Sequence, residues 1–346
     1  MREERSVWVD HAKAIGIMLV VYGHIARGLQ NSDIEKPSQL LTLIDGIIYS
    51  FHMPLFFFLA GLFFIQSLTE KGASGTVLSK LDTIFYPYLL WSILQGSAEA
   101  LMADYTNGGV SFTEVFSLLW APRAQFWFLY ALFFVCVVST LLYSRHLASY
   151  GILIFVISII LYLFSEYFSA FIIPYFIAGH LVFFSMGIFF KKHLKIEYFR
   201  SMAALILSAA AFITAQWIFH IQLGIKNSES NMIHLVVTTI SIVFVVSVSA
   251  NLSRLKLKFL AYVGASSLAI YVMHVMAGSG TRIMLKKLLN IDSFEIHLIV
   301  GFLVAILAPL VVSKAIETLK IRGIFSAPIS QIVMNTHQKL LKCFSN

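Results

Sequence analysis

Long apolar runs recur along this chain of 346 residues, and they constrain its fold more than any other feature. A bilayer core about 30 Å thick needs about 20 apolar residues per helix, and ten runs reach or nearly reach that length. Backbone polar groups find no water in lipid, so such runs cross the membrane as helices. The sequence therefore predicts an all-α, polytopic membrane protein with about ten transmembrane helices. The runs are 8–29, 41–66, 79–102, 124–143, 149–166, 171–190, 202–222, 232–250, 258–277 and 296–316.

The composition excludes a soluble domain. Hydrophobic residues make up 59% of the chain and charged residues 12%, and the mean hydropathy is +0.84. Two cysteines, Cys136 and Cys343, offer neither a disulfide framework nor a thiolate metal cluster. The first run carries Asp10 and Lys13 and lacks a small-residue cleavage site, so we expect it to remain as a membrane helix.

The distribution of basic residues predicts the orientation, because short cytoplasmic loops carry an excess of Lys and Arg. With the N-terminus inside, the even loops hold the basic clusters, among them residues 191–200. The odd loops are sparse in charge or acidic, except that the last one holds Arg282, Lys286 and Lys287. We predict that both termini are cytoplasmic. The net charge of +8 then reflects topology and not nucleic-acid binding.

No domain boundary or internal repeat is evident within the apolar part of the chain. We expect one integral-membrane domain over residues 1–322 and a cytoplasmic C-terminal tail over 323–346. A short interfacial helix is expected around 329–343.

Two ionisable residues, Lys13 and His24, share one face of the first predicted helix. Eleven residues separate them, which corresponds to about 16 Å along the helix axis. Ionisable groups inside a membrane span face the protein interior and mark functional paths. The alternative is that Lys13 snorkels to the interface and His24 is a hydrogen-bonded interior histidine.

Other polar residues lie within the predicted spans. His52 is followed by Pro54, which predicts a kink beside a polar cavity, although a packing helix with His52 bonded to a backbone carbonyl is the alternative. Ser267, Tyr271 and His274 lie one turn apart on related faces of the ninth span. We expect the histidines of the first, second and ninth spans to converge on one intramembrane chamber.

Histidine chemistry suits such a chamber. No serine-hydrolase elbow, metalloprotease motif, phosphate-binding loop or soluble acyltransferase His-x-x-x-x-Asp motif is present. The histidines are too scattered for their spacing to predict a metal site, and a His-rich ion site is the alternative. An imidazole has an ordinary pKa near neutrality and is a suitable general base. It could deprotonate a sugar hydroxyl that attacks a thioester, or accept the acyl group itself.

Four ordered motifs resemble those of the integral-membrane acyltransferase-3 family, and within it the fucose 4-O-acetylase-related group of polysaccharide O-acetyltransferases. They are a basic residue ten positions before a His, a His-Met-Pro with following aromatics, a Trp-Phe-Leu, and a Ser-Leu-x-Ile-Tyr-x-x-His. The matching residues are Asp10, Lys13, His24, His52, Met53, Pro54, Gly61, Trp127, Phe128, Leu129, Ser267, Tyr271 and His274. The chain departs from the family pattern before Pro87, where Lys80 and Asp82 replace a basic cluster.

The resemblance implies an O-acetyltransferase of the bacterial inner (plasma) membrane. The acyl donor would be cytoplasmic acetyl-CoA, and the acceptor an extracytoplasmic glycan, free or lipid-linked, with membrane lipids around the protein and no nucleic-acid partner. Succinyl transfer, transfer of another acyl group, and a glycan transporter or flippase without acyl transfer are the alternatives. A transporter would be expected to show repeated halves with broken helices.

The resemblance also implies roles for the matching residues. His24 would be the general base or an acyl relay, with His52 and His274 as further catalytic residues. Lys13 would meet the donor phosphates and Asp10 would hold Lys13. Trp127, Ser267 and Tyr271 would shape the cavity.

Overall fold

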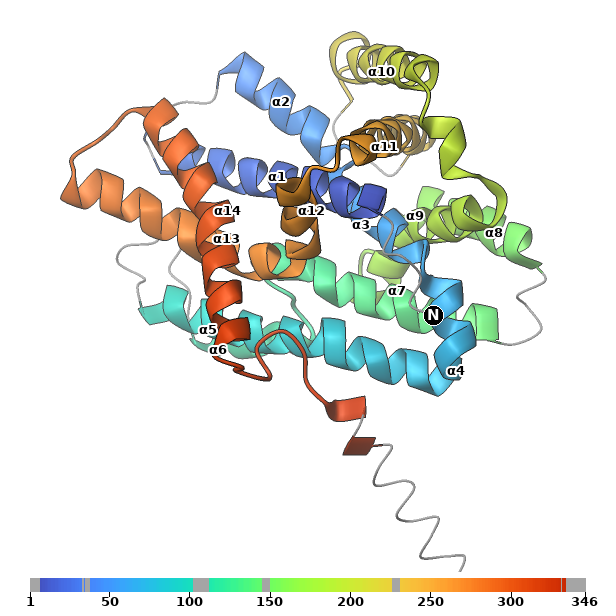
Figure 1. Ribbon diagram of the computed structural model, residues 1–346, viewed down its shortest axis with the longest axis horizontal. Coiled ribbons are helices and arrows are strands. Elements are labelled where there is room, and N and C mark those ends of the chain that lie inside the picture. The colour runs from blue at the N-terminus through green and yellow to red at the C-terminus, as the bar shows by residue number, and fades with distance from the viewer. Residues whose placement is uncertain are drawn as a thin grey trace, which may run out of the picture.

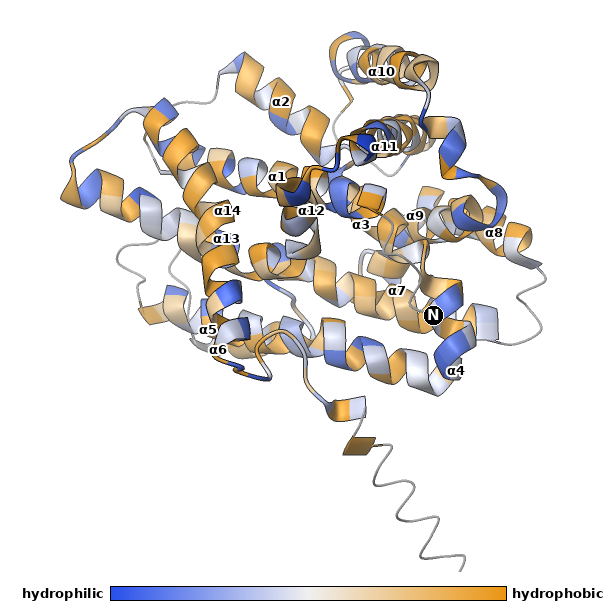
Figure 2. Ribbon diagram, viewed as in Figure 1, coloured by the Kyte–Doolittle hydropathy of each residue, from blue (hydrophilic) through white to orange (hydrophobic). Residues whose placement is uncertain are grey.

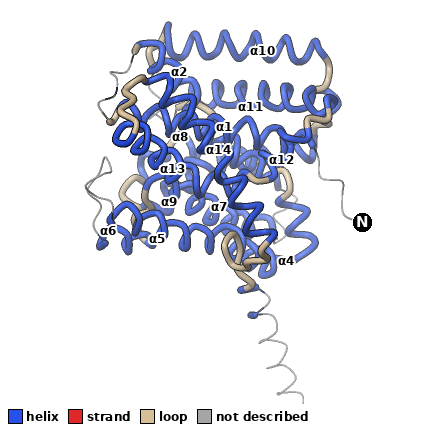
Figure 3. Tube along the Cα trace, turned by 60° about the vertical axis from the view of Figure 1, so that its left-hand side comes forward, coloured by secondary structure: helices blue, strands red, loops and turns tan. Residues whose placement is uncertain are grey.

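The computed structural model describes residues 7–32, 34, 38–101, 112–144, 150–225, 231–330 and 332–333. Within these ranges the regular elements are helices and there are no strands (Figure 3), which confirms the all-α prediction. The helices are α1 (Val7–Gln30), α2 (Gln39–Tyr49), α3 (His52–Gly61), α4 (Phe64–Lys80), α5 (Tyr86–Leu101), α6 (Phe112–Phe116), α7 (Trp127–Ser144), α8 (Gly151–Leu163), α9 (Ile172–His193), α10 (Met202–Trp217), α11 (Met232–Leu252), α12 (Lys258–Ala265), α13 (Ser267–Ile283) and α14 (Phe294–Thr318).

Eight helical segments of the described chain are long and apolar enough to cross a membrane. The predicted runs 79–102 and 149–166 are not among them, although α5 and the shorter α8 occupy these positions. The count of ten spans and the orientation of the termini therefore stay predictions. The eight segments are Val7–Gln30, Gln39–Gly61, Thr113–Ser144, Ile172–His193, Met202–Gln222, Met232–Leu255, Ser267–Leu288 and Phe294–Thr318.

Helix α1 runs through the middle of the bundle and packs against α3, α11, α12, α13 and α14 (Figure 1). Its interior residues Ala12, Ala14 and Ile17 are fully buried. Hydrophobic residues cover most of the helical ribbon (Figure 2). Large apolar side chains are exposed on outer helices, as at Ile206 and Leu207 of α10, which is the pattern expected of a lipid-facing surface.

Glycines allow several helices to cross with their backbones in contact. A Cβ at Gly264 of α12 would lie 1.7 Å from the carbonyl oxygen of Asp10 in α1. At the crossing of α3 and α9, a Cβ at Gly61 or Gly187 would lie 2.1 Å from a backbone oxygen of the other helix. Small residues at interfaces let membrane helices approach closely, and here they position α1 at the centre.

The predicted second span, 41–66, is divided into α2 and α3 at Ser50 and Phe51. The break begins four residues before Pro54, where a proline removes a helical hydrogen bond and its ring clashes with the carbonyl four residues earlier. That carbonyl belongs to Ser50, and it accepts a hydrogen bond from the hydroxyl of Thr238 in α11 at 2.7 Å. The predicted kink beside His52 is therefore present.

The predicted ninth span, 258–277, is likewise divided, at Ser266, into α12 and α13. Helix α13 continues past the predicted end, and a π-helical turn extends it to Leu288. Arg282 and Lys286 therefore lie on a helix, and their assignment to a loop was wrong. The basic residues that break the charge pattern of the odd loops are therefore helical. Only the fold shows what surrounds them.

The segment after Arg322 packs against the start of α5. Tyr86 donates to the carbonyl of Gly323 at 2.7 Å, and the Trp91 indole donates to that of Ile324 at 3.0 Å. Asp82, which stands where the family pattern has a basic cluster, accepts hydrogen bonds from the backbone and hydroxyl of Ser330. The boundary at residue 322 stays a prediction, and most of the expected interfacial helix at 329–343 lies outside the described residues.

Candidate functional site

A cavity of about 690 Å³ lies at the C-terminal end of α1, and we call it the His24 cavity. Its walls come from α1, the end of α2, the end of α5, the segment before α7, α13 and the start of α14. Apart from the end of α2, which lies deeper in the predicted second span, these segments fall on the side that the charge distribution predicts to be extracytoplasmic. Polar side chains on these walls include those of His24, Arg27, Tyr49, Glu99, Arg123 and Arg282.

His24, on the cavity wall, contacts the ring of His274 in α13. Their ring centroids are 5.0 Å apart in an edge-to-face arrangement. His24 is partly exposed and lines the cavity, whereas His274 is fully buried. The structure thus brings together two of the three histidines that we expected to meet.

The hydrogen bonds of His274 define its protonation pattern. Its Nδ1 lies 2.7 Å from the carbonyl oxygen of Tyr271 and 3.1 Å from that of Ile270. Carbonyl oxygens only accept, so Nδ1 carries the proton and Nε2 keeps a lone pair. That Nε2 is buried and has no hydrogen-bond partner among the described residues. An acceptor nitrogen is therefore available beside the His24 ring.

Small residues allow α13 to approach α1 at this point. A Cβ at Gly278 would lie 2.2 Å from Cδ1 of Ile25, the residue after His24. At Gly280, which also lines the cavity, a Cβ would meet no atom within 4 Å. The first glycine sets the distance between the helices, and the second leaves space for a ligand.

His52 lies behind the cavity wall. Its Nδ1 is 2.8 Å from the carbonyl oxygen of Ile48, and its ring centroid is 4.5 Å from that of Tyr49. Tyr49 itself lines the cavity. The hydrogen bond is the one that the packing interpretation of His52 anticipated, and a catalytic role for His52 stays a prediction.

Arg27 was not singled out in the sequence, although it lies one turn after His24 on the same helix. Its guanidinium forms a two-point contact with Asp45 of α2, with N–O distances of 2.7 and 2.9 Å. Its Cζ lies 3.2 Å from the centroid of the Tyr49 ring, a cation–π contact. These contacts join α1 to α2 across one wall of the cavity.

The opposite wall joins α5 to the segment before α7. Arg123 lies 3.4 Å from a carboxylate oxygen of Glu99. The side-chain amides of Gln95 and Gln125 exchange hydrogen bonds. The Tyr271 hydroxyl donates to the backbone carbonyl of Gln125. Among the polar residues of the two walls, only Arg27 could have been predicted from the sequence, because it lies one turn after His24 on the same helix. The other residues come from distant parts of the sequence.

The remaining predicted site residues do not line the His24 cavity. Trp127 stacks on Phe176 at 5.8 Å, and Ser267 lies two turns before His274 at the start of α13. Asp10 and Lys13 lie in the N-terminal half of α1. The structure therefore does not bring these four residues to the histidine pair.

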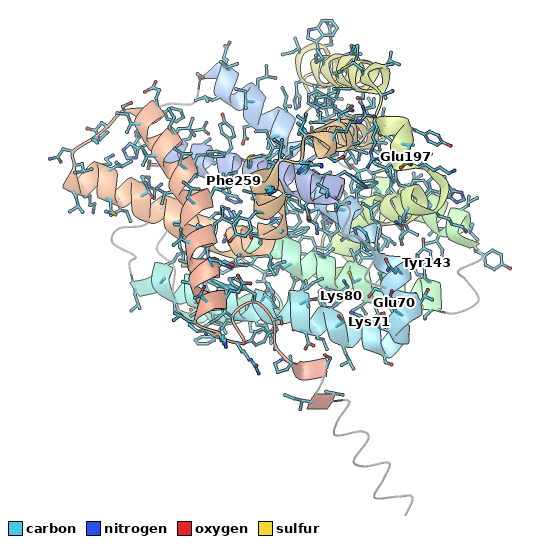
Figure 4. All side chains as sticks on the ribbon, viewed as in Figure 1. Glu70, Lys71, Lys80, Tyr143, Glu197 and Phe259 are labelled. Atoms are coloured by element: carbon cyan, nitrogen blue, oxygen red, sulfur yellow. The ribbon has the colours of Figure 1, made fainter. Side chains whose placement is uncertain are left out.

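A second cavity, of about 520 Å³, lies at the other end of α1, and we call it the basic cavity. Trp8, Phe63, Lys191, Lys195 and Arg200 contribute to its walls. Glu197, labelled in Figure 4, also lines it and lies 3.8 Å from Arg200. Within the described ranges, His, Cys, Asp and Glu form no group of three or more that could hold a metal ion.

Comparison with known proteins gives a family match. The profile of the acyltransferase-3 family, described as an acyltransferase domain, matches residues 6–317. No curated protein and no solved structure matches the chain. The finer resemblance to the fucose 4-O-acetylase-related group stays a prediction. Since the match spans nearly all of the helical bundle, the chain belongs to the acyltransferase-3 family and is a multi-pass membrane acyltransferase.

Proposed function

We propose that the chain transfers an acetyl group from cytoplasmic acetyl-CoA to a hydroxyl of an extracytoplasmic glycan, with His24 at the reacting centre. One observation carries this assignment. Of the three histidines expected in the site, His24 is the one that lines the large cavity, and it is backed by the unpartnered Nε2 of His274.

The basic cavity supports access of an anionic donor from the opposite end of α1. Lys191, Lys195 and Arg200 supply positive charge near the N-terminus of α1. Lys13 lies farther along the helix, about 16 Å before His24, and this length is of the order of a pantetheine arm. In this proposal the donor phosphates stay at the basic end and the thioester reaches His24, while Asp10 holds Lys13.

The His24 cavity has the character of an acceptor site. Its volume of about 690 Å³ is within the range of small-molecule pockets. Tyr49 offers a flat apolar ring, and the charged residues around it offer donors and acceptors for sugar hydroxyls. These features favour a glycan acceptor. The hydrogen bond from Tyr271 to the Gln125 backbone links α13 to the segment before α7, which forms part of the wall.

The reaction follows from a neutral His24. Its unprotonated nitrogen takes the proton of the acceptor hydroxyl as the oxygen attacks the thioester carbonyl. The resulting tetrahedral oxyanion collapses, the C–S bond breaks, and the coenzyme A sulfur leaves with the proton held by His24. In the relay alternative, a nitrogen of His24 attacks the thioester carbonyl, the C–S bond breaks and the coenzyme A thiolate leaves. The acceptor oxygen then attacks the acetyl group, the bond between nitrogen and acetyl carbon breaks, and the hydroxyl proton passes to the thiolate.

His274 acts as a positioning residue in this mechanism. Its Nδ1–H is held by backbone carbonyls, so its Nε2 can accept a hydrogen bond from a neighbouring donor such as the single N–H of neutral His24. A hydrogen bond of this kind would select the tautomer of His24 that has its free lone pair toward the cavity.

Transfer from radiolabelled acetyl-CoA into membrane glycans tests the proposal. We expect membranes with the wild-type chain to incorporate label, and His24→Ala to lower the rate by at least about 100-fold at matched abundance. His193→Ala, at an exposed histidine of α9, should transfer as the wild type does. Retained transfer in His24→Ala would remove the central assignment, and no label from any chain would favour another acyl donor or transport.

A further inference from the structure

Three arginines line the His24 cavity, and they differ in their partners. Arg27 and Arg123 each face a carboxylate, at 2.7 and 3.4 Å. Arg282 instead donates to the carbonyl of Gly28 at 2.6 Å and, among the described residues, pairs with no carboxylate. The described wall of the cavity therefore carries one positive charge without a counter-ion.

The contact with Gly28 satisfies only part of the hydrogen-bonding capacity of the Arg282 guanidinium. Gly28 lies in the last turn of α1, where carbonyls lack helical partners and a nearby cation is favourable. That contact uses one N–H, and a guanidinium has five. Arg282 is only partly exposed and lies in a membrane-spanning helix, where a charge without a partner is costly. An anionic ligand in the cavity would satisfy the remaining donors.

We infer that the acceptor carries an oxyanion, a carboxylate or a phosphate, and that Arg282 binds it beside His24. The inference rests on the proposed function and adds the chemical class of the acceptor. Carboxylate and phosphate both match the two-point geometry of a guanidinium.

The spacing along α1 places this anion relative to the reacting hydroxyl. Gly28, which holds the Arg282 guanidinium, is one turn beyond His24, or about 6 Å along the axis. One sugar ring spans a distance of this order. The anion is therefore on the acetylated sugar itself, as the carboxylate of an acidic sugar, or on its anomeric oxygen, as the phosphate of a sugar phosphate.

Lys286 provides a matched control for Arg282. It lies one turn farther along the same helical stretch, with Nζ 3.4 Å from the carbonyl oxygen of Ser32, and it does not line the cavity. Both residues are cations near the end of α1. A substitution at Lys286 removes the same charge from the neighbourhood without removing a cavity wall.

Protection of His24 from chemical modification tests the inference without any acyl transfer. The full chain in lipid nanodiscs is treated with diethyl pyrocarbonate, and carbethoxylation of His24 is followed by mass spectrometry, with exposed His193 as the internal reference. Glucuronic acid, glucose 1-phosphate and neutral methyl glucoside are the probes. We expect at least one anion to protect His24 at about 10-fold lower concentration than the neutral glycoside.

The variants assign that preference to one side chain. Arg282→Gln should abolish the advantage of the anion, Arg282→Lys should keep part of it, and Lys286→Gln should keep all of it. The stronger of the two anions distinguishes an acidic sugar from a sugar phosphate, and either result supports the inference.

Equal protection by the neutral glycoside, no protection by either anion, or a preference that survives Arg282→Gln would overturn the inference. The wild-type comparison decides the question even where the glutamine variant does not fold. Since no acetyl-CoA is present, failure of acyl transfer would overturn the proposed function and leave this result intact.

Discussion

The two halves of α1 are packed in different ways. Near its N-terminus, α1 meets α12 backbone against backbone, with Gly264 against the carbonyl of Asp10. Near its C-terminus, α1 meets α13 through the side chain of Ile25 against Gly278, and the cavity of about 690 Å³ opens beside this contact. The N-terminal half of the helix is fixed by a close backbone contact, whereas the C-terminal half borders the His24 cavity, which is larger than the basic cavity at the other end.

This difference separates polar residues that the sequence alone presents as equivalent. Asp10 and Lys13 lie beside the close crossing, whereas His24 and Arg27 face open volume. A catalytic group needs a substrate within hydrogen-bond reach, so open volume is the better guide to chemistry than the presence of an ionisable residue.

The largest expected effect comes from closing the glycine contact in the N-terminal half. Gly264→Ala would place a Cβ 1.7 Å from the Asp10 carbonyl oxygen, and two helix backbones would have to separate. We expect a loss of more than about 3 kcal/mol of stability and little folded protein. Gly278→Ala is the matched control, because it meets only the flexible end of Ile25, and it should cost about 1 kcal/mol. Yield of monodisperse protein and thermal unfolding measure both, and equal behaviour of the two variants would contradict the comparison.

The next effect concerns the C-terminal half, where His274 supports His24. His274→Ala should lower kcat by about 10- to 100-fold, because His24 loses its positioning contact, while the KM for acetyl-CoA stays unchanged. Steady-state transfer rates at varied donor concentration separate the two constants. A rise in KM with normal kcat would show that His274 serves donor binding and not the orientation of His24.

A smaller effect is expected from Lys13, in the half without the large cavity. Lys13→Gln should raise the KM for acetyl-CoA by about 3- to 10-fold, through loss of one charged contact to the donor, with little change in kcat. Lys13→Arg, which keeps the charge, is the control. If kcat falls while KM stays normal, Lys13 belongs with the reacting groups.

The smallest effect is expected at Trp127, which stacks on Phe176 outside the cavity wall. Trp127→Phe keeps an aromatic ring at this position and should change the transfer rate by less than about three-fold. The same transfer assay measures it. A loss comparable with that of His274→Ala would place Trp127 in the acceptor site after all.

Much of the fold was predictable from local pattern. The apolar runs lie close to the observed helices, since about 20 apolar residues in sequence favour a membrane helix whatever surrounds them. The break at Phe51 lies where Pro54 predicts a kink, because a proline disturbs the helix one turn before it. The break at Ser266 was missed, because small residues such as Gly264 and Ser266 are also common inside membrane helices and do not by themselves end one.

The candidate site was predictable only in part, because the sequence does not show which helices become neighbours. Spacing along one helix relates Lys13 to His24, and that spacing is enough to make each of them a candidate. The pairing of Arg27 with Asp45 and the lack of a carboxylate partner at Arg282 among the described residues depend on which helices become neighbours. Arg282 in particular was assigned to a loop, and its place in the cavity follows from the extension of α13.

The sequence by itself determined the helical membrane class, the acyltransferase-3 motifs and the candidate histidines, because hydropathy and residue spacing act within single helices. The tertiary structure alone decided which histidine lines the cavity, which ones are buried, and which arginine of the described cavity wall has no carboxylate partner. These properties depend on distances between helices. Glycine contacts such as that of Gly264 with the Asp10 backbone set those distances, and a linear pattern does not contain them.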